Sequence, residues 1–435
     1  MSDVSSEQSV PTSSTDRIMA LDIMRGFALF GILLLNITGF GLVWAAYANP
    51  AVMGGHEGIN QTVWLINSLL TEGTMRTIFS MMFGAGVILL TSRMEATGRQ
   101  DICADIYYRR TLWLVIFGVI HSYLLLWTGE VLYMYGIVGL MLFPLRKLTP
   151  RILIISGFIA LLAYTPTRVS NYQESMNAHI AYQEISTLVE SEATLNNEQQ
   201  EVLDKWTEID ESTNPTVEQK EKDLSSVRGG YWTMFDWAKN ENIAYYGTNF
   251  YAGGFLDVLS MMLIGMGLLK LGVLTAARTT SFYIKMMIVG YSVGVSVNWY
   301  EAQMILADNF STMSFVKAGI TYDLGRLFVA AGHIGLVMTI IKLGLFNWLQ
   351  NGLAAVGKMA LTSYISHSII CGIIFYGVGF GLYGTMERHE LYYVVFAIYV
   401  FQLIFSPLWL RYYKFGPIEW VWRSLTYLKK QPMRK

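Results

Sequence analysis

Leu21-Asp22-Ile23-Met24-Arg25-Gly26-Phe27 opens the stretch that decides the class of this protein, and Ala28-Leu29-Phe30-Gly31-Ile32-Leu33-Leu34-Leu35-Asn36 completes it. Asp22 and Arg25 stand three residues apart, the spacing at which two side chains share one face of a helix. An apolar run follows, and Asn36 interrupts it about 16 Å beyond Arg25 at 1.5 Å per residue. An amide is costly at that depth in a membrane, so Asn36 is a candidate functional residue.

The composition around this stretch indicates a membrane protein. Of the 435 residues, 53% are hydrophobic and only 14% are charged, whereas soluble domains carry about a quarter of charged residues. Only helices and closed barrels satisfy their backbone in lipid, and the long apolar runs favour helices. The partners expected from this composition are membrane lipids. A net charge of −1 gives no reason to expect a nucleic-acid partner.

Ten stretches are apolar enough to cross about 30 Å of hydrocarbon. We therefore expect an all-α fold, a polytopic bundle of about ten transmembrane helices with a helical extracytoplasmic insert. The fourth and fifth stretches are short. The predicted spans are 25–46, 74–91, 111–128, 130–146, 151–166, 252–271, 281–299, 321–341, 356–381 and 391–410.

The placement of lysine and arginine predicts the orientation of these spans. With both termini in the cytoplasm, the cytoplasmic segments carry 21 of the 31 basic residues. The short outer loops then carry only Arg76, Lys317 and Arg388. This distribution follows the positive-inside rule. It predicts a multi-pass membrane protein with cytoplasmic N and C termini.

The spans divide the chain into five parts. We expect a disordered cytoplasmic tail over 1–20, membrane halves of five spans each over 21–166 and 251–410, and a basic cytoplasmic tail over 411–435. Between the halves, 167–250 carries 15 acidic and six basic residues. Its composition predicts helix from Glu174 to Asp210, ended or restarted at Pro215. This acidic insert is either a solvated cap or a lid over an outward-facing site.

Several local patterns favour structural roles. Phe415 to Arg423 predicts an interfacial helix begun by Gly-Pro. Gly84-Ala85-Gly86 and Gly265-Met266-Gly267 are interpreted as contacts between closely packed helices. Cys103 and Cys371 fall in different environments and predict neither a disulfide nor a metal site, and no metal is expected.

His121 is the strongest candidate for chemistry, since it lies about 15 Å into the third span and imidazole suits general acid–base work. Glu130 follows at the outer edge, where a carboxylate would orient the imidazole. The alternative for His121 is a hydrogen bond between helices. Further candidates to line a polar cavity are Asp257, Asp323, Arg326, His333, Ser363 and His367, and His56 with Glu57 lies in the first outer loop.

Several separated motifs resemble the YeiB family of bacterial inner-membrane proteins, whose C-terminal half is a domain of unknown function. The resemblance covers nearly the whole chain except the acidic insert. The motifs are Arg17-Ile18-x-x-Leu21-Asp22-x-x-Arg25-Gly26, Phe79-Ser80-Met81-Met82-Phe83-Gly84-Ala85-Gly86, Gly118-Val119-Ile120-His121 with Leu126-Trp127-Thr128-Gly129-Glu130, Gly357-Lys358-Met359-Ala360-Leu361-Thr362-Ser363-Tyr364, and Gly416-Pro417-Ile418-Glu419-Trp420-Val421-Trp422-Arg423.

The resemblance implies membership of the transmembrane acyltransferase superfamily, through the opening L-D-x-x-R-G. Bacterial O-acetylating relatives keep a His where this chain has Asn36. The heparan-glucosaminide acetyltransferase type has an Asn there and places its catalytic His in the following loop, where this chain has His56. His121 belongs to the YeiB motif itself and is the preferred base. His367 and Ser363 replace the usual Gln and Asn of the family pattern, so they are expected only to line a cavity.

The function implied is transfer of an acyl (acetyl) group from cytoplasmic acyl-CoA (acetyl-CoA) to an envelope glycan, lipid or small-metabolite acceptor at the outer face. Arg25, Arg93, Arg109 and Arg110, with Asp22 beside them, would meet the donor phosphates. Asn36 would position the thioester carbonyl. The alternatives are a transporter or lipid flippase using the same polar core, or a non-catalytic membrane factor. The sequence leaves the oligomeric state open.

Overall fold

The computed structural model describes residues 14–98, 100–191 and 193–435, and the side chains of 14–18 and of Thr248 lie outside that description. Most of the predicted N-terminal tail, residues 1–13, is therefore also outside it. Within the described ranges the regular elements are helices, in agreement with the predicted all-α class.

A helix occupies each of the ten predicted spans. One difference is in the ninth, which is broken: α16 (Asn347–Lys358) and α17 meet at a bend of 85°. The ten helices are α1 (Ser14–Gly41), α4 (Thr74–Ala96), α5 (Cys103–Tyr123), α6 (Leu132–Leu145), α7 (Pro150–Leu162), α12 (Phe255–Lys270), α13 (Thr280–Ala307), α15 (Tyr322–Leu343), α17 (Ala360–Phe375) and α18 (Leu391–Tyr412).

Not all ten helices are long and apolar enough to cross a membrane alone. In the described part of the chain seven helical segments pass that test, and eight pass if α16 and α17 count as one broken span. α6 is a shorter apolar helix, and α5, which begins among charged residues, is not among the seven. Three of the seven are long because neighbouring helices continue one another: Gly58–Ala96, Pro150–Glu190 and Tyr231–Lys270.

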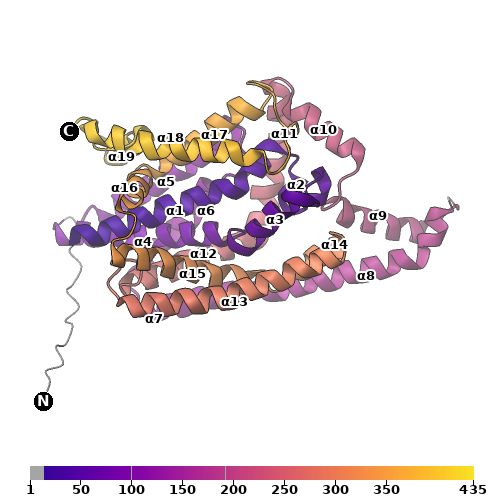
Figure 1. Ribbon diagram of the computed structural model, residues 1–435, viewed down its shortest axis with the longest axis horizontal. Helices are drawn as coiled ribbons and strands as arrows, with labels where there is room; N and C mark the ends of the chain where they lie inside the picture. Colours follow the sequence, from indigo (N-terminus) through magenta and orange to yellow (C-terminus); the bar gives the residue numbers. More distant parts are fainter. Residues whose placement is uncertain (1–13, 99, 192) are drawn as a thin grey trace, which may run out of the picture.

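The acidic insert is helical, as predicted, and its first and last helices prolong membrane helices. α8 (Thr165–Glu190) continues α7, while α11 (Tyr231–Ile243) runs through the π-helix η2 (Ala244–Gly254) into α12. α9 (Asn197–Glu211) and α10 (Val217–Val227) each begin with a capping box, at Asn196 and Thr216. Pro215 lies between them and separates two helices, as expected. In Figure 1, α8 and α9 project beyond the bundle.

Glycines allow the central helices to approach closely. A Cβ at Gly26 would meet the Leu353 carbonyl of α16, and one at Gly357 would meet the Asp22 carbonyl of α1. Gly84 likewise faces the Met262 carbonyl across α4 and α12. The prediction that Gly84 lies at a close contact between two helices is confirmed. A Cβ at Gly86 would instead lie near the Arg25 guanidinium, at 3.4 Å.

The bundle has two distinct ends (Figure 1). The termini end holds the start of α1 and the short α19 (Pro417–Tyr427), which is the predicted Gly-Pro helix. The insert end holds α8 to α10 and the elements that follow α1. Those elements are α2 (Ala45–Ala48), η1 (Pro50–Met53) and α3 (Gly58–Leu70), and α14 (Thr312–Ala318) lies near them. Each end contains a cavity lined by charged residues.

Candidate functional site

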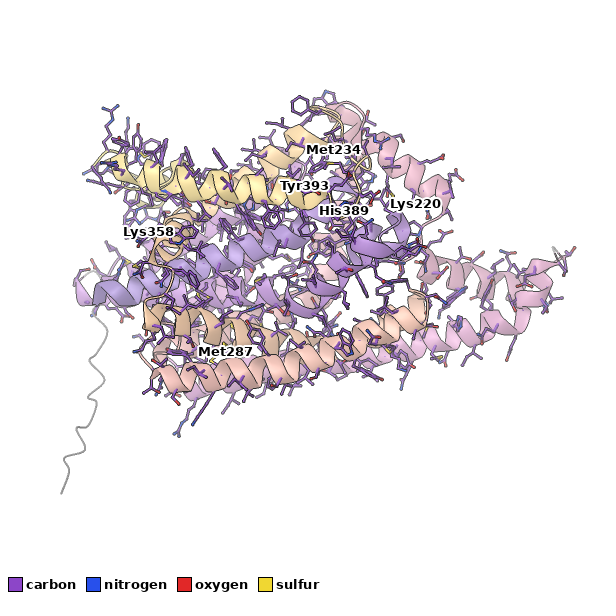
Figure 2. All side chains as sticks on the ribbon, viewed as in Figure 1. Lys220, Met234, Met287, Lys358, His389 and Tyr393 are labelled. Carbon is purple, nitrogen blue, oxygen red and sulfur yellow. The ribbon has the colours of Figure 1, made fainter. Side chains whose placement is uncertain are left out.

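The first cavity, here called the inner cavity, has a volume of about 330 Å³ and lies toward the termini end. Its walls come from α1, α4, α5, α6, α16, α17 and α19. Figure 2 places Lys358, one of its lining residues, at that end. Five basic side chains line it: Arg25, Arg93, Arg110, Lys358 and Arg423.

The carboxylates near these cations are already engaged. Asp22 pairs with Arg25 at 3.2 Å. Glu419 accepts hydrogen bonds from the Leu361 and Thr362 N–H groups, at 2.7 and 3.0 Å, and so caps the N-terminus of α17. In the described chain, no ion pair is formed by the other four basic residues of the cavity. The inner cavity therefore has an excess of positive charge, which suits an anionic ligand.

Aromatic rings of α19 and of the residues just before it hold two of the arginines in place. The Arg110 guanidinium lies 3.7 Å from the centre of the Trp422 ring, and the Trp422 indole donates to the Arg110 carbonyl at 2.8 Å. Arg423 lies over Phe415 at 4.4 Å. Such cation–π contacts position a guanidinium without neutralising it. α19 thus forms a wall that presents charge to the cavity.

The deep part of the inner cavity reaches Tyr135 and Tyr364. Tyr135 shares a hydrogen bond of 2.7 Å with Ser80. The Tyr364 ring lies edge-on against the ring of His121, with 5.1 Å between centroids. Tyr364 therefore separates the cationic cavity from the predicted base.

His121 is completely buried and is held from both sides. Its Nε2 lies 2.7 Å from Ser368 Oγ of α17, and its Nδ1 lies 3.5 Å from Glu130 Oε1. Glu130 is also fully buried, and its two oxygens accept from the N–H groups of Leu132 and Tyr133 at the start of α6. The predicted association of His121 with Glu130 is present, and Ser368 joins it.

The other predicted residues of the donor site are divided by the structure. Arg25, Arg93 and Arg110 line the inner cavity, whereas Asp22 and Arg109 are not among its lining residues. Arg109 instead donates to the Asp105 carbonyl at 3.2 Å.

Two predicted catalytic residues lie away from His121. Asn36 is half-buried, lines neither the inner cavity nor the outer cavity described below and, among the described residues, makes no side-chain hydrogen bond. His56 lies in the loop before α3, where its Nε2 is 3.6 Å from Glu57. Neither residue is brought to the inner cavity, because α1 directs Asn36 elsewhere and His56 follows the insert end of that helix.

A second cavity, the outer cavity, has a volume of about 300 Å³ toward the insert end. It is lined by acids as well as bases, among them Glu72, Glu301, Arg168, Arg326 and Arg388. Because Arg168 belongs to α8, the base of the acidic insert forms part of its wall.

Two of the basic residues that line this outer cavity, Arg326 and Arg168, are paired with carboxylates, whereas Arg388 donates to the Ala46 carbonyl. Arg326 bonds Asp257, and its ion pair with Asp323 is 2.6 Å. Arg76 lies 3.3 Å from Asp257, and Arg168 lies 3.3 Å from Asp323. The chain of ion pairs therefore joins α4, α8, α12 and α15. Of the predicted cavity residues, Arg326 lines the outer cavity. Asp257 and Asp323 do not line it, but they neutralise the charge of Arg326.

The remaining predicted cavity residues are engaged in hydrogen bonds between helices. His333 lies 2.7 Å from the Tyr291 hydroxyl and 2.8 Å from the Leu70 carbonyl. His367 lies 3.2 Å from Gln402 Oε1, and Gln402 donates to the Ser363 carbonyl at 3.0 Å. None of His333, Ser363 and His367 lines the inner or outer cavity. Their positions fit structural hydrogen bonding, which is the common role of polar residues between membrane helices.

The described residues form neither a disulfide nor a cluster suited to a metal ion. Cys103 and Cys371 are free and buried. No group of three or more His, Cys, Asp or Glu side chains within residues 14–98, 100–191 and 193–435 is arranged to hold a metal ion.

Sequence reasoning missed four residues that the structure adds to the site: Lys358, Arg423, Tyr364 and Ser368. Lys358, Arg423 and Tyr364 stand inside motifs quoted above, so their motifs were a usable signal. Ser368 carried no such signal. It stands 247 positions after His121, and only the packing of α17 against α5 brings the two together.

Comparison with known proteins gives a consistent family. Residues 268–429 match the family model described as "Protein of unknown function (DUF418)". The chain is 26% identical over 435 residues to the Bacillus subtilis "Uncharacterized protein YxaH", covering 98% of each chain. It is 29% identical over 414 residues to the Escherichia coli "Uncharacterized protein YeiB", covering 94% of this chain and 96% of the relative.

A third relative, from Bacillus acidopullulyticus, is an "Uncharacterized 39.9 kDa protein in amylase 3'region", 27% identical over 97% of each chain. No solved structure matches this chain. Three relatives aligned along nearly their full length, together with the domain match in the C-terminal half, support the resemblance drawn from the motifs. Together these matches support a YeiB-family assignment.

Proposed function

We propose that this protein is a transmembrane acyltransferase that accepts an acyl group from acyl-CoA bound in the inner cavity. One observation carries the proposal: a cavity lined by five basic side chains ends at Tyr364, whose ring contacts His121. A donor with anionic phosphates and a reactive thioester needs a cationic site beside a base.

The residues divide between binding and chemistry. Arg25, Arg93, Arg110, Lys358 and Arg423 hold phosphate oxygens by charge-assisted hydrogen bonds, and the arginines can do so in a bidentate way. His121 accepts a proton, and Glu130 keeps its ring oriented. The acceptor is an envelope glycan, lipid or small metabolite. Asn36 and His56 have no part in this proposal, because neither lines the inner cavity.

The orientation of the protein follows from the same charges. With the termini end in the cytoplasm of a bacterial inner membrane, the inner cavity opens toward the compartment that holds acyl-CoA. The basic residues of α19 and the C-terminal tail then lie inside, as the positive-inside rule requires. The acidic insert lies outside, toward the acceptor.

A matched pair of neighbouring arginines tests donor binding. Arg110 lines the inner cavity and Arg109 does not, although they are adjacent and carry the same charge. We expect Arg110→Gln to weaken binding of acetyl-CoA to the purified protein by about 10- to 100-fold, as for loss of one hydrogen bond to a charged group. Arg109→Gln should change the Kd less than about threefold. Isothermal titration calorimetry measures both, with melting temperatures as a control of folding.

The absence of acetyl-CoA binding to a folded wild-type protein would contradict the proposal. So would equal effects of the two substitutions, because a general loss of surface charge would then explain the result.

A transporter is the second candidate, and the pair of cavities at opposite ends of one bundle favours it. A carrier alternates access between two such cavities, using ionisable groups within the membrane. Flux of a labelled anion into proteoliposomes, with no consumption of acyl-CoA, would support this candidate instead. Acyl transfer without flux would exclude it.

A further inference from the structure

Ser368, His121 and Glu130 form a linear arrangement of hydroxyl, imidazole and carboxylate. Ser368 Oγ lies 2.7 Å from His121 Nε2, and Glu130 Oε1 lies 3.5 Å from His121 Nδ1. The three residues come from α17, α5 and the loop before α6. This is the order in which a nucleophile, its base and an orienting acid are arranged in acyl-transfer enzymes, where the base–acid distance is often longer without substrate.

The surroundings determine which nitrogen of His121 carries the proton. Glu130 accepts from two backbone N–H groups at the N-terminus of α6, where the helix dipole stabilises negative charge. A carboxylate facing Nδ1 requires an N–H there. Nε2 is then left as an acceptor, and the Ser368 hydroxyl donates to it. This direction of the hydrogen bond prepares the serine to lose its proton to the imidazole.

Two unpaired donors lie beside this arrangement. In the described chain, neither the buried Trp127 indole N–H nor the buried Tyr364 hydroxyl has a partner that meets hydrogen-bond geometry, although the Trp127 indole and the Val131 backbone N–H both face the Tyr364 hydroxyl. Tyr364 stands one turn before Ser368 on the same face of α17. Trp127 is fixed by stacking on Phe40, at 3.7 Å between ring centres. Unpaired donors are expensive to bury and are used to stabilise developing negative charge.

The loop that supplies two of these groups is folded tightly over His121. Leu126 takes a left-handed backbone conformation, with φ of 57°, and the backbone N–H of Trp127 donates to the His121 carbonyl at 3.4 Å. Strained backbone of this kind is found at functional sites, because the surrounding structure must hold it. The loop therefore brings the Glu130 carboxylate to the His121 imidazole and the Trp127 indole to Tyr364.

We propose that Ser368 is a covalent nucleophile and that acyl transfer passes through an acyl-Ser368 intermediate. The inference rests on the proposed function, since the donor is acyl-CoA. In the first step Ser368 Oγ gives its proton to His121 Nε2 and attacks the thioester carbonyl carbon. The carbon–sulfur bond breaks, and the leaving sulfur takes the proton from Nε2 to become the CoA thiol.

The second step returns the enzyme to its starting state. The acceptor hydroxyl or amine gives its proton to His121 Nε2 and attacks the ester carbonyl carbon. The bond from that carbon to Ser368 Oγ breaks, and Oγ recovers the proton. In both steps Trp127 and Tyr364 donate to the carbonyl oxygen while it carries negative charge.

Tyr364 controls entry to this site. His121 and Glu130 are fully buried and Ser368 is 3% exposed, whereas Tyr364 lines the inner cavity. The thioester reaches Ser368 when the Tyr364 ring moves from between them. The phosphates of the donor remain among the cations while its acyl end passes this ring.

The test uses the purified full-length protein with acetyl-CoA and no acceptor. We expect a rapid release of about one equivalent of CoA thiol per protein, the kinetic sign of an acyl-enzyme. Mass spectrometry of the intact protein and of its peptides should locate one acetyl group on Ser368. Ser368→Ala should lower acetylation by about three orders of magnitude or more, and Ser366→Ala, one half-turn away on α17, should leave it unchanged.

Binding separates the failure of this inference from the failure of the proposed function. Ser368→Ala should retain the wild-type Kd for acetyl-CoA, since the basic residues are intact, and His121→Gln should bind without becoming acetylated. Turnover of acetyl-CoA by Ser368→Ala at the wild-type rate would overturn the covalent step and leave acyl transfer standing. A folded protein that does not bind acetyl-CoA would overturn both.

Discussion

The two cavities have similar volumes and both are lined by several arginines, but they differ in how many of these arginines have a carboxylate partner. In the outer cavity Arg326 is 1% exposed and contacts two aspartates, and Arg76 and Arg168 extend the same set of ion pairs. In the inner cavity only Arg25 of the five basic residues has a carboxylate partner among the described residues. In the outer cavity the charges of Arg326 and Arg168 are neutralised by ion pairs that hold helices together. The inner cavity leaves its charge available to a ligand.

The difference shows that the number of charged residues at membrane depth does not identify a binding site. A charge buried without a partner must be compensated, either by another side chain or by something that binds. The sequence predicts Arg110 to bind the donor and Arg326 to line a cavity, and their partners in the structure distinguish them. Substitutions in the two cavities should therefore separate effects on stability from effects on binding.

The largest effect on stability is expected from Arg326→Met. It leaves Asp257 and Asp323 buried with less compensation, which costs about 3–5 kcal/mol when one partner of a buried pair is removed. Arg93→Gln in the inner cavity removes a charge that has no carboxylate partner, so its cost should stay below about 1 kcal/mol. Denaturant unfolding of both variants in detergent measures the difference. Equal losses would break the distinction between the two cavities.

The next effect concerns stabilisation by ligand. CoA at about 100 times its Kd should raise the free energy of unfolding by about 2.7 kcal/mol, since it binds the folded state alone. Because the contact is with phosphates in a partly open cavity, added salt should reduce this gain. Thermal melts with and without CoA, at low and high salt, check the expectation. A gain that does not depend on salt would place the ligand outside the inner cavity.

Two glycines of α4 offer a smaller and more local comparison. Gly84→Ala pushes a methyl group into the Met262 carbonyl of α12 and should cost about 1–3 kcal/mol by overpacking. Gly86→Ala meets only the Arg25 guanidinium at 3.4 Å, so it should alter stability little and weaken CoA binding by crowding that side chain. Measuring melting temperature and Kd for each variant would show which glycine serves packing. A large stability loss in Gly86→Ala would contradict this assignment.

The smallest effect should come from Glu419→Gln. Burial raises the pKa of Glu419 above its usual value of 4.5, despite its hydrogen bonds to Thr362 and Leu361. The folded state thus binds this proton more tightly than the unfolded state, so the contribution is full below pH 4.5 and is lost as pH rises through the raised pKa. The variant should show a weaker decline of stability above pH 4.5. Melting temperatures from pH 4 to 8 test this, and an unchanged slope would refute it.

The membrane helices could be predicted well because hydropathy is a local property. Each of the ten predicted stretches contains a helix, and the Gly-Pro start of α19 and the restart at Pro215 also follow from neighbouring residues. The break at Met359 was missed because residues 356–381 were predicted as one span from their average hydropathy, which carries no signal for the 85° bend between α16 and α17. The same limit explains why the extension of α7 into α8 was not foreseen.

The candidate site was predicted only in part. Arg25, Arg93 and Arg110 were found because basic residues next to the spans can be read from the sequence, and His121 and Glu130 because they share one motif. His333 and His367 were predicted to line a polar cavity, yet the structure places both in hydrogen bonds between helices. A sequence shows which polar side chains enter the membrane, but not the partner that each one meets there.

The sequence by itself determined the membrane class, the helical spans and the concentration of basic residues outside them, because these depend on composition and on neighbours along the chain. Only the tertiary structure decided that Arg326 is neutralised, that Arg110 is not, and that Ser368 meets His121. The physical reason is that those outcomes depend on how α5, α15 and α17 rotate and pack. Contacts between helices form at glycines such as Gly84 and at single carbonyls, and hydropathy carries no information about that rotation.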